Sequence, residues 1–451
     1  MSSELIISVS GLRGIVGDTL TAEVAARYAL AYEAGLEMGP IVITRDGRGS
    51  GRMLADAIAT ALASKGRIVL DADVAATPTT GVLVRSHGAA AGIQISASHN
   101  PIEWNGLKLF GADGRVIPAT AGEAVIERFH AAEPVKLTAN GNEGDANIRQ
   151  LDETLSAHLQ LIEEIVDVER IRAANFRVLL DSNHGAGSLL GRHLLKELGC
   201  QLELFGGTPD GHFAHTPEPT AENLAEVAPQ VVARGAVIGF CQDPDADRLA
   251  VIDEQGNYLG EEYTLAICVD HVLRQKVGPV VTNCSTSRMS QDIAEKYGAP
   301  FYRSKVGEAN VTDLMIEHQA VIGGEGNGGT IDPRVVYVRD SFVGMALLLD
   351  AMAARQVSIS ELAAELPRYE MVKAKVALAK ERLPAALNAL KAHFSDAETD
   401  DLDGLRFDWP GRWLLVRASN TEPIVRIMAE AADAAAAQAI CDEAGQVIAE
   451  V

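Results

Sequence analysis

Short apolar runs alternate with amphipathic segments of helical length along most of the chain. Residues 41–44, 91–96 and 176–180 are runs with the length and apolar character of buried strands. Helical segments of about 10–15 residues separate such runs, as expected for α/β units built on parallel sheets. From residue 369 on the order changes, because two strands lie between a helix over 383–393 and a closing alanine-rich helix.

This pattern divides the chain into four segments. The length of 451 residues exceeds what one hydrophobic core supports, so we predict three related α/β domains and a smaller C-terminal α+β domain. Their expected ranges are residues 1–150, 151–255, 256–368 and 369–451. The segments share an order of elements, but no sequence repeat of fixed period. The other expected elements are helices over 51–64, 152–168, 188–198 and 287–297, and strands over 67–70, 279–283, 320–323, 413–417 and 424–429.

The composition narrows the possible partners. The formal net charge of −23 argues against nucleic acid or an anionic membrane surface. No run of about 18 apolar residues could span a membrane, and no basic stretch precedes the short apolar patch near the N-terminus. The five scattered cysteines form no metal-type pair, which is typical of buried thiols in the cytoplasm. A phosphorylated ligand would need a local cluster of Arg and Lys in this acidic chain.

A serine-rich loop follows the apolar strand at 91–96. It reads Ser96-Ala-Ser-His-Asn-Pro101, and Asn105-Gly-Leu-Lys108 comes shortly after it. The Asn-Pro step breaks any helix and forces a loop. A hydroxyl presented in this way can accept a phosphoryl group, provided that cations neutralise the transferred charge. An ordinary polar turn with capping serines would give the same pattern.

An acidic loop lies between two further apolar runs. It reads Asp243-Pro-Asp-Ala-Asp247-Arg248, with a carboxylate at every second position. Oxygen ligands of this kind favour Mg²⁺ or Ca²⁺. An EF-hand is excluded because Arg248 stands where that loop requires glycine, and strands rather than helices flank it. A solvated acidic loop is the weaker interpretation, since three carboxylates between buried strands repel one another unless a cation joins them.

Two glycine-rich segments admit a nucleotide-binding interpretation. Gly323-Gly-Glu-Gly-Asn-Gly-Gly329 contains a Gly-x-Gly-x-x-Gly pattern, but Pro333 prevents the helix that a dinucleotide site requires. The segment from Gly185 to Gly191 is a closer match, because a strand precedes it and a helix follows. Such glycines more often let a helix pack closely on a strand, so a nicotinamide-dependent dehydrogenase is a distant alternative.

Several cationic positions lie at turns where a phosphate could bind. The segment Arg417-Ala-Ser-Asn-Thr-Glu-Pro423 offers backbone N–H groups, hydroxyls, an amide and a guanidinium, and Arg426 follows it. A simple hairpin turn is the alternative. Other cations stand near strand ends, where ligands of α/β sheets bind, although each alone could be an ordinary surface residue. These are Arg13, Arg45, Arg48, Arg303 and Lys305.

Taken in order, these motifs resemble the signature of the α-D-phosphohexomutase superfamily, and the resemblance covers nearly the whole chain. The resemblance implies four domains around a central cleft, with Ser98 as a phosphoserine. It implies one Mg²⁺ held by Ser98, Asp243, Asp245 and Asp247, with Arg248 beside the metal. Arg13, Lys108 and His99 become the candidates for proton transfer and transition-state stabilisation. The implied substrate-binding residues are Glu325, Asn327, Arg248, Lys305, Arg417, Ser419, Asn420, Thr421 and Arg426.

The resemblance also implies a reaction. Phospho-Ser98 would exchange its phosphoryl group with a hexose phosphate through a hexose 1,6-bisphosphate, acting as intermediate and activator. Many relatives carry Ser and His where this chain has Asn327 and Gly329, which makes Lys108 the preferred acid or base. The Glu-Gly-Asn-Gly-Gly sequence is similar to phosphoglucosamine mutases of the archaeal type. We therefore expect glucosamine 6-phosphate as substrate, then mannose or glucose phosphates, in a cytoplasmic monomer or homodimer; a non-catalytic sugar-phosphate binder is a distant alternative.

Overall fold

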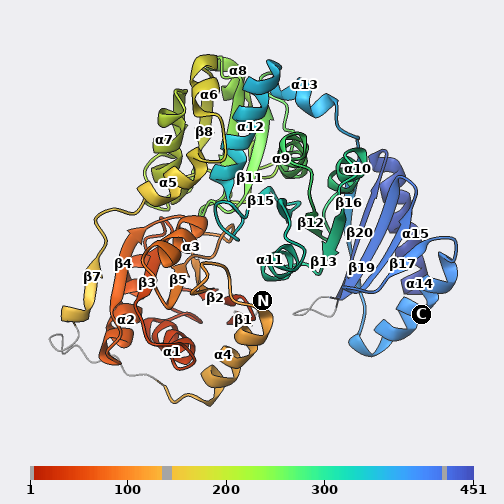
Figure 1. Cartoon of the computed structure of the whole chain (residues 1–451). Coiled ribbons are helices and arrows are strands. Elements are labelled where there is room, and N and C mark those ends of the chain that lie inside the picture. The colour runs from red at the N-terminus through yellow and green to blue at the C-terminus, as the bar shows by residue number, and fades with distance from the viewer. Residues whose placement is uncertain (1–4, 135–144, 419–423) are drawn as a thin grey trace.

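The computed structural model describes residues 5–134, 145–418 and 424–451. It shows three α/β domains with mixed sheets and a C-terminal domain with an antiparallel sheet, which confirms the predicted fold class (Figure 1). The domain boundaries near residues 150, 255 and 368 remain predictions. In the part of the chain that is described, no helix combines the length and the apolar character needed to cross a membrane.

The first sheet has seven strands in the order β1-β2-β6-β5-β3-β4-β7. Strands β5, β3, β4 and β7 pair in parallel, whereas β6 and β2 pair antiparallel beside them. Leu12, Tyr28, Ile43, Ile58 and Ile93 belong to the apolar core beneath this sheet. The elements are β1 Ile6–Ser8, β2 Gly11–Ile15, α1 Ala22–Glu33, β3 Ile41–Arg45, α2 Gly51–Ser64, β4 Val69–Val74, α3 Thr77–Ser86, β5 Ala91–Ile95, β6 Trp104–Gly111, α4 Ala119–Ala131 and β7 Ile148–Gln150.

The second sheet has four strands in the order β11-β10-β8-β9. Three of them are parallel, and β11 closes the edge antiparallel to β10. The single helix predicted over 152–168 is wrong in extent, because Asp167 caps a second helix and divides the segment in two. The elements are α5 Ser156–Glu163, α6 Val168–Ala174, β8 Arg177–Asp181, α7 Gly187–Glu197, β9 Gln201–Phe205, α8 Ala228–Ala233, β10 Ile238–Gln242 and β11 Leu249–Asp253.

The third sheet repeats this plan in the order β13-β12-β14-β15, again with an antiparallel last strand. Helix α12 is buried along most of its length and packs on both α9 and α6, so a continuous core joins the second and third domains. The elements are α9 Glu261–Gln275, β12 Val280–Asn283, α10 Met289–Lys296, β13 Phe301–Ser304, α11 Glu308–Glu317, β14 Ile322–Glu325, β15 Gly329–Ile331, α12 Ser341–Arg355 and α13 Ile359–Ala364.

The last domain is an antiparallel sheet in the order β16-β20-β19-β18-β17 with α14 and α15 forming its helical layer. Trp413 and Leu415 pack from this sheet against Cys284 of the third domain. The elements are β16 Glu370–Ala377, α14 Leu383–His393, β17 Glu398–Asp400, β18 Leu405–Trp409, β19 Arg412–Ala418, β20 Ile424–Ala431 and α15 Ala434–Ala449.

The three α/β domains share one structural position. In each, a parallel strand ends in a short loop that leads into the antiparallel strand beside it: β5 to β6, β10 to β11, and β14 to β15. The serine loop, the acidic loop and the glycine-rich segment 323–329 occupy these three connections. The related folding of the domains therefore gives the chemically distinctive loops equivalent places.

Candidate active site

The serine loop places Ser98 in the buried contact between the first two domains. Ser98 has a left-handed backbone with φ of 50° and is 2% exposed. Its Oγ donates a 2.7 Å hydrogen bond to Asp243 Oδ2, and its N–H donates to Ser96 Oγ. A left-handed conformation is uncommon for a residue with a side chain, and it often marks a functional position. The sequence therefore holds this hydroxyl against the acidic loop rather than in an ordinary exposed turn.

Arg48 braces the serine loop from within. Its side chain is fully buried, its Nε donates to Asp46 Oδ2 at 2.9 Å, and its Nη atoms donate to four backbone carbonyls of the loop. Those carbonyls belong to Ser98, Asn100, Pro101 and Trp104. Arg48 therefore lies next to Ser98, but its guanidinium is not free to bind a phosphate, because its donors are used by backbone carbonyls.

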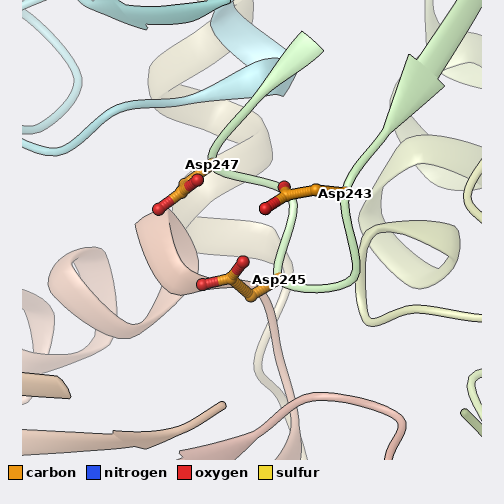
Figure 2. Close-up of side chains that lie close together, drawn as sticks. All are labelled: Asp243, Asp245 and Asp247. Carbon is orange, nitrogen blue, oxygen red and sulfur yellow. The ribbon is translucent and has the colours of Figure 1, made fainter. Parts of the chain in front are cut away.

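The acidic loop brings three carboxylates together. Asp243, Asp245 and Asp247 are buried, and one oxygen from each lies within 4.8 Å of the others. Figure 2 shows the three side chains arising from the short loop between β10 and β11. Ala246 makes this turn possible with a φ of 57°, and Ser341 Oγ donates a 2.7 Å hydrogen bond to its carbonyl. The loop is thus shaped to gather acidic groups.

Two neighbouring donors contact Asp245. Thr77 Oγ1 donates to Asp245 Oδ2 at 2.6 Å, and Lys108 Nζ donates to the same oxygen at 2.9 Å. Lys108 also donates to Asp247 Oδ2 at 2.7 Å. Burial opposes the ionised form, but the ammonium and the hydroxyl together hold the pKa of Asp245 below its usual range. Burial and repulsion from the two other aspartates raise the pKa of Asp243.

The buried oxygens that remain free fit a divalent cation. Within the described residues, Asp245 Oδ1 and Asp247 Oδ1 are buried and have no hydrogen-bond partner. Burying a carboxylate oxygen without a hydrogen-bond partner costs free energy, so these oxygens indicate a bound group that supplies positive charge. The donors are all oxygens, which suits Mg²⁺. The aspartate triad therefore fits the magnesium site expected from the sequence.

Three further predicted residues surround Ser98 and the triad. Arg13 Nη1 donates to Asn100 Oδ1 at 2.9 Å, which places this guanidinium beside the serine loop. His99 Nδ1 lies 3.2 Å from Ser98 Oγ. Burial, with the charges of Arg248 and Arg13, lowers the pKa of His99 to about 3. Arg248 donates its backbone N–H to Asp243 Oδ1, and its side chain approaches Glu218 at 3.6 Å.

The glycine-rich segment 323–329 forms a tight hairpin between β14 and β15. A strand and not a helix follows it, so it lacks the local architecture of a dinucleotide site. Glu325 is 5% exposed and accepts hydrogen bonds from Asn283 Nδ2 and the Gly307 N–H. Asn327 Nδ2 contacts Glu325 Oε2 at 3.4 Å, while Asn327 Oδ1 is buried without a partner among the described residues. The hairpin thus presents one unused acceptor.

The other glycine-rich segment serves packing. Helix α7 begins at Gly187, where an added Cβ would lie 2.3 Å from Gln242 Oε1 and 2.8 Å from Ala246 Cβ. A Cβ at Gly191 would lie 2.7 Å from Leu180. These glycines let the helix approach the strands closely, which is the alternative to nucleotide binding that the sequence left open.

Arg339 is a central residue that sequence reasoning missed. Its guanidinium donates to Asp247 Oδ2 at 2.7 Å and to Glu325 Oε2 at 2.6 Å, and it contacts Glu308 at 3.3 Å. It therefore joins the acidic loop of the second domain to the hairpin of the third. Burial opposes its charge, but the carboxylates raise the pKa of Arg339 well above the usual value. No local motif marked it, although it directly precedes Asp340, the N-cap of α12.

The predicted phosphate loop lies only partly in the described structure. Ser419, Asn420 and Thr421 are outside the described residues. Arg417 pairs with Asp403 at 3.0 Å, and Arg426 lies directly opposite Arg417 in the sheet.

Three of the other predicted cations differ in their surroundings. Lys305 is exposed in the turn before α11. Arg303 is paired with Asp408 of the last domain at 3.2 Å, and Arg45 with Asp73 at 2.8 Å, so both guanidinium groups have protein partners. The structure thus brings Ser98, Arg13, His99 and Lys108 to the triad, whereas the contacts of Arg417 lie within its own domain.

Comparison with known proteins matches all four parts of the chain to one family. Residues 5–136, 156–256 and 260–369 match the phosphoglucomutase/phosphomannomutase alpha/beta/alpha domains I, II and III. Residues 371–446 match the C-terminal domain of the same family. The four matches follow the family order.

Relatives match over nearly their whole length. A phosphoglucomutase/phosphomannomutase of Thermococcus kodakarensis is 37% identical over 431 residues, covering 93% of each chain. A protein of Methanopyrus kandleri named a probable phosphoglucosamine mutase is 32% identical, covering 96% of this chain and 95% of its own. A crystal structure of a phosphoglucomutase/phosphomannomutase family protein from Burkholderia thailandensis has a TM-score of 0.80 at 27% identity, with 98% of each chain covered.

The chain belongs to the phosphoglucomutase/phosphomannomutase family of the α-D-phosphohexomutase superfamily, and it is a phosphohexomutase.

Proposed function

We propose that this enzyme interconverts glucosamine 6-phosphate and glucosamine 1-phosphate through a phosphorylated Ser98 and a hexose 1,6-bisphosphate. The observation that carries the proposal is the 2.7 Å hydrogen bond from Ser98 Oγ to Asp243 Oδ2. It joins the serine loop of the first domain to the acidic loop of the second. A phosphoryl acceptor next to a cation site is the arrangement that phosphoryl transfer requires.

The chain's own groups would act around this hydroxyl. Bound at the aspartate triad, Mg²⁺ would neutralise negative charge on the phosphoryl group. Arg13 lies beside the same loop and would add positive charge where the transferred oxygens gather. His99 Nδ1, 3.2 Å from Ser98 Oγ, and Lys108, which bonds two of the three aspartates, are our candidates for moving the proton of the attacking hydroxyl.

The second, third and last domains would hold the rest of the substrate. Glu325 and Asn327 of the hairpin would contact sugar hydroxyls, with Arg248 and Lys305 nearby in the second and third domains. The phosphate that is not transferred would bind the last domain, where Arg417 and Arg426 lie side by side. The proposed residues of this clamp also include Ser419, Asn420 and Thr421. A movement of the last domain would let one clamp serve both orientations of the bisphosphate.

The hairpin supports glucosamine as the preferred sugar. Asn327 turns its Nδ2 toward Glu325, which leaves Oδ1 as a buried acceptor without a partner among the described residues. An ammonium group has three donors and no acceptor, so it matches an amide oxygen beside a carboxylate. A hydroxyl can donate to the same atom, and the relative that is 37% identical is named a phosphoglucomutase/phosphomannomutase. Glucose or mannose phosphate is therefore the second candidate.

A substrate panel tests the choice of sugar. Turnover of glucosamine, glucose and mannose 6-phosphates is compared as kcat/KM, and we expect glucosamine 6-phosphate to have the highest value. A higher value for glucose or mannose 6-phosphate would replace the first candidate with the second. The variant Asn327→Ser should reduce the preference for glucosamine, because a hydroxyl is a shorter and different acceptor.

The phosphoserine has its own test. The intact mass of the purified protein should show one phosphate, and peptide mapping should place it on Ser98. The variant Ser98→Ala should lack both the phosphate and turnover while unfolding cooperatively. A phosphate on another residue, or turnover by Ser98→Ala, would overturn the proposal. A protein that binds sugar phosphates but turns none over would instead be a non-catalytic binder.

A further inference from the structure

The register of the last sheet places three cations in one row. Arg426 on β20 lies directly opposite Lys375 on β16 and directly opposite Arg417 on β19. Residues directly opposite each other in an antiparallel sheet point to the same face, with Cβ atoms about 4.5–5.5 Å apart. The three side chains therefore stand side by side across three neighbouring strands. Lys375 is the member of this row that no sequence motif indicated.

The row lies on the face of the sheet that is turned toward the third domain. On β16, Val372, Ala374 and Val376 pack into the core beneath α14 and α15. The alternate residue Met371 packs with Met428 against the third domain. Because side chains alternate along a strand, Lys375 lies on the same face as Met371.

The row has little negative charge to balance it. Arg417 pairs with Asp403, and its Nε is buried without a hydrogen-bond partner among the described residues. Lys375 and Arg426 are exposed, and neither makes an ion pair within residues 5–134, 145–418 and 424–451. Like charges directly opposite each other destabilise a sheet, and this chain has a net charge of −23. Three adjacent cations on an acidic protein therefore indicate a site for an anion.

We propose that Lys375 is a third cation of the substrate clamp and binds the phosphate that is not being transferred. The inference rests on the proposed function, because the anion is the distal phosphate of the same sugar. The four-carbon stem of Lys375 lets its ammonium reach toward Arg426, and a compact ammonium adds charge without imposing a direction. The clamp would thus extend over β16, β20 and β19, beyond the loop that the sequence motif marks.

Kinetics of Lys375→Gln tests this role. Because the same clamp holds either phosphate in turn, KM should rise about fivefold for both the hexose 6-phosphate and the hexose 1-phosphate, as expected for about 1 kcal/mol from an exposed charge. The value of kcat should change less than about twofold, since Lys375 would contribute equally to ground state and transition state. Lys375→Arg should restore KM. An unchanged KM, or a fall in kcat alone, would overturn the proposal.

A matched control separates a local contact from overall charge. Lys391 is an exposed lysine of α14 on the opposite face of the same domain, so Lys391→Gln makes the same change in net charge. It should leave KM unchanged, and an equal rise in KM would count against a contact at Lys375.

A binding measurement distinguishes failure of the role proposed for Lys375 from failure of the proposed function. Calorimetry with glucose 6-phosphate on Ser98→Ala and on Ser98→Ala/Lys375→Gln needs no turnover. We expect the second variant to bind about fivefold more weakly. Equal dissociation constants would refute the role of Lys375 even if the wild type is active, and weaker binding would support it even if the wild type turns over none of the panel.

Discussion

The Arg48 guanidinium donates a 2.7 Å hydrogen bond to the carbonyl oxygen of Ser98. Ser98, whose hydroxyl is the proposed phosphoryl acceptor, is thus held through its backbone by the fully buried Arg48 side chain. Asp46 completes the arrangement, because its carboxylate accepts from Arg48 Nε, from the Arg48 N–H and from Ser96 Oγ. The geometry of the serine loop therefore depends on one buried ion pair.

Replacing Arg48 should unfold the protein more easily. Arg48→Met leaves the Asp46 carboxylate buried without its cation, so we expect the free energy of unfolding to fall by about 3–5 kcal/mol. Urea denaturation measures this change. The matched control is Arg45→Met at the end of strand β3, whose partner Asp73 is 46% exposed; it should cost about 0–1 kcal/mol. Equal losses in the two variants would show that the buried pair of Arg48 and Asp46 contributes no more to stability than an exposed pair does.

Removing one carboxylate of the triad should abolish most of the activity while preserving the fold. Asp245→Asn removes a metal-binding charge but keeps the shape of the side chain, so turnover should fall by about 100-fold or more. Initial rates with saturating Mg²⁺ measure this fall. Mg²⁺ should also raise the melting temperature of the wild type through linkage, and raise that of the variant less. Full activity of the wild type after treatment with a chelator would contradict the assignment of the triad.

Arg339 should be required both for stability and for the coupling of two loops. Arg339→Gln leaves Glu308 and Glu325 buried without their cation, so we expect a loss of about 3–5 kcal/mol in the free energy of unfolding and a large fall in kcat/KM. Arg339→Lys should recover only part of either property, because a single ammonium cannot reproduce the contacts of a forked guanidinium. Arg172→Gln is the control, since Arg172 is 41% exposed and its partners Glu169 and Glu197 are 82% and 47% exposed. Comparable effects of the Arg172 and Arg339 variants would refute this role.

The local pattern of apolar and polar residues predicted those helices and strands whose ends coincide with a change in that pattern. The helices over 51–64 and 383–393 match α2 and α14, because each has a clear apolar stripe and a polar end. The strand predicted over 67–70 instead runs from Val69 to Val74. Arg67 lies outside the strand and donates to the carbonyls of Leu36 and Glu37. The second half of the strand was not predicted, because the polar residues Asp71 and Asp73 interrupt its apolar pattern.

The candidate site also has parts that the local sequence predicted and parts that it did not. The serine and acidic loops could be recognised because each carries its chemistry within a few consecutive residues. Arg339 could not, because its partners Asp247, Glu308 and Glu325 come from three separate segments that only the tertiary fold brings together. The brace formed by Arg48 was missed for the same reason, since backbone carbonyls leave no trace in the sequence.

Glu261 should make the stability of the enzyme depend on pH. This first residue of α9 is half-buried, and its Oε1 has no hydrogen-bond partner among the described residues. Burial raises the pKa of Glu261 from 4.5 to about 7, although the charges of Arg248 and Lys373 oppose the shift. The folded protein therefore keeps a proton that the unfolded chain releases between these two pH values.

The sign of the dependence follows from this difference in proton binding. A raised carboxyl pKa contributes stability below the unfolded value of 4.5, and that contribution is lost as the pH rises through about 7. Glu261→Gln has no proton to lose, so its free energy of unfolding relative to the wild type should increase by about 3 kcal/mol between acidic and neutral pH. Urea denaturation of both proteins across this range measures the difference, and the unchanged remaining acids cancel in the comparison. Parallel curves for the two proteins would show that Glu261 ionises at its ordinary pKa in the folded state.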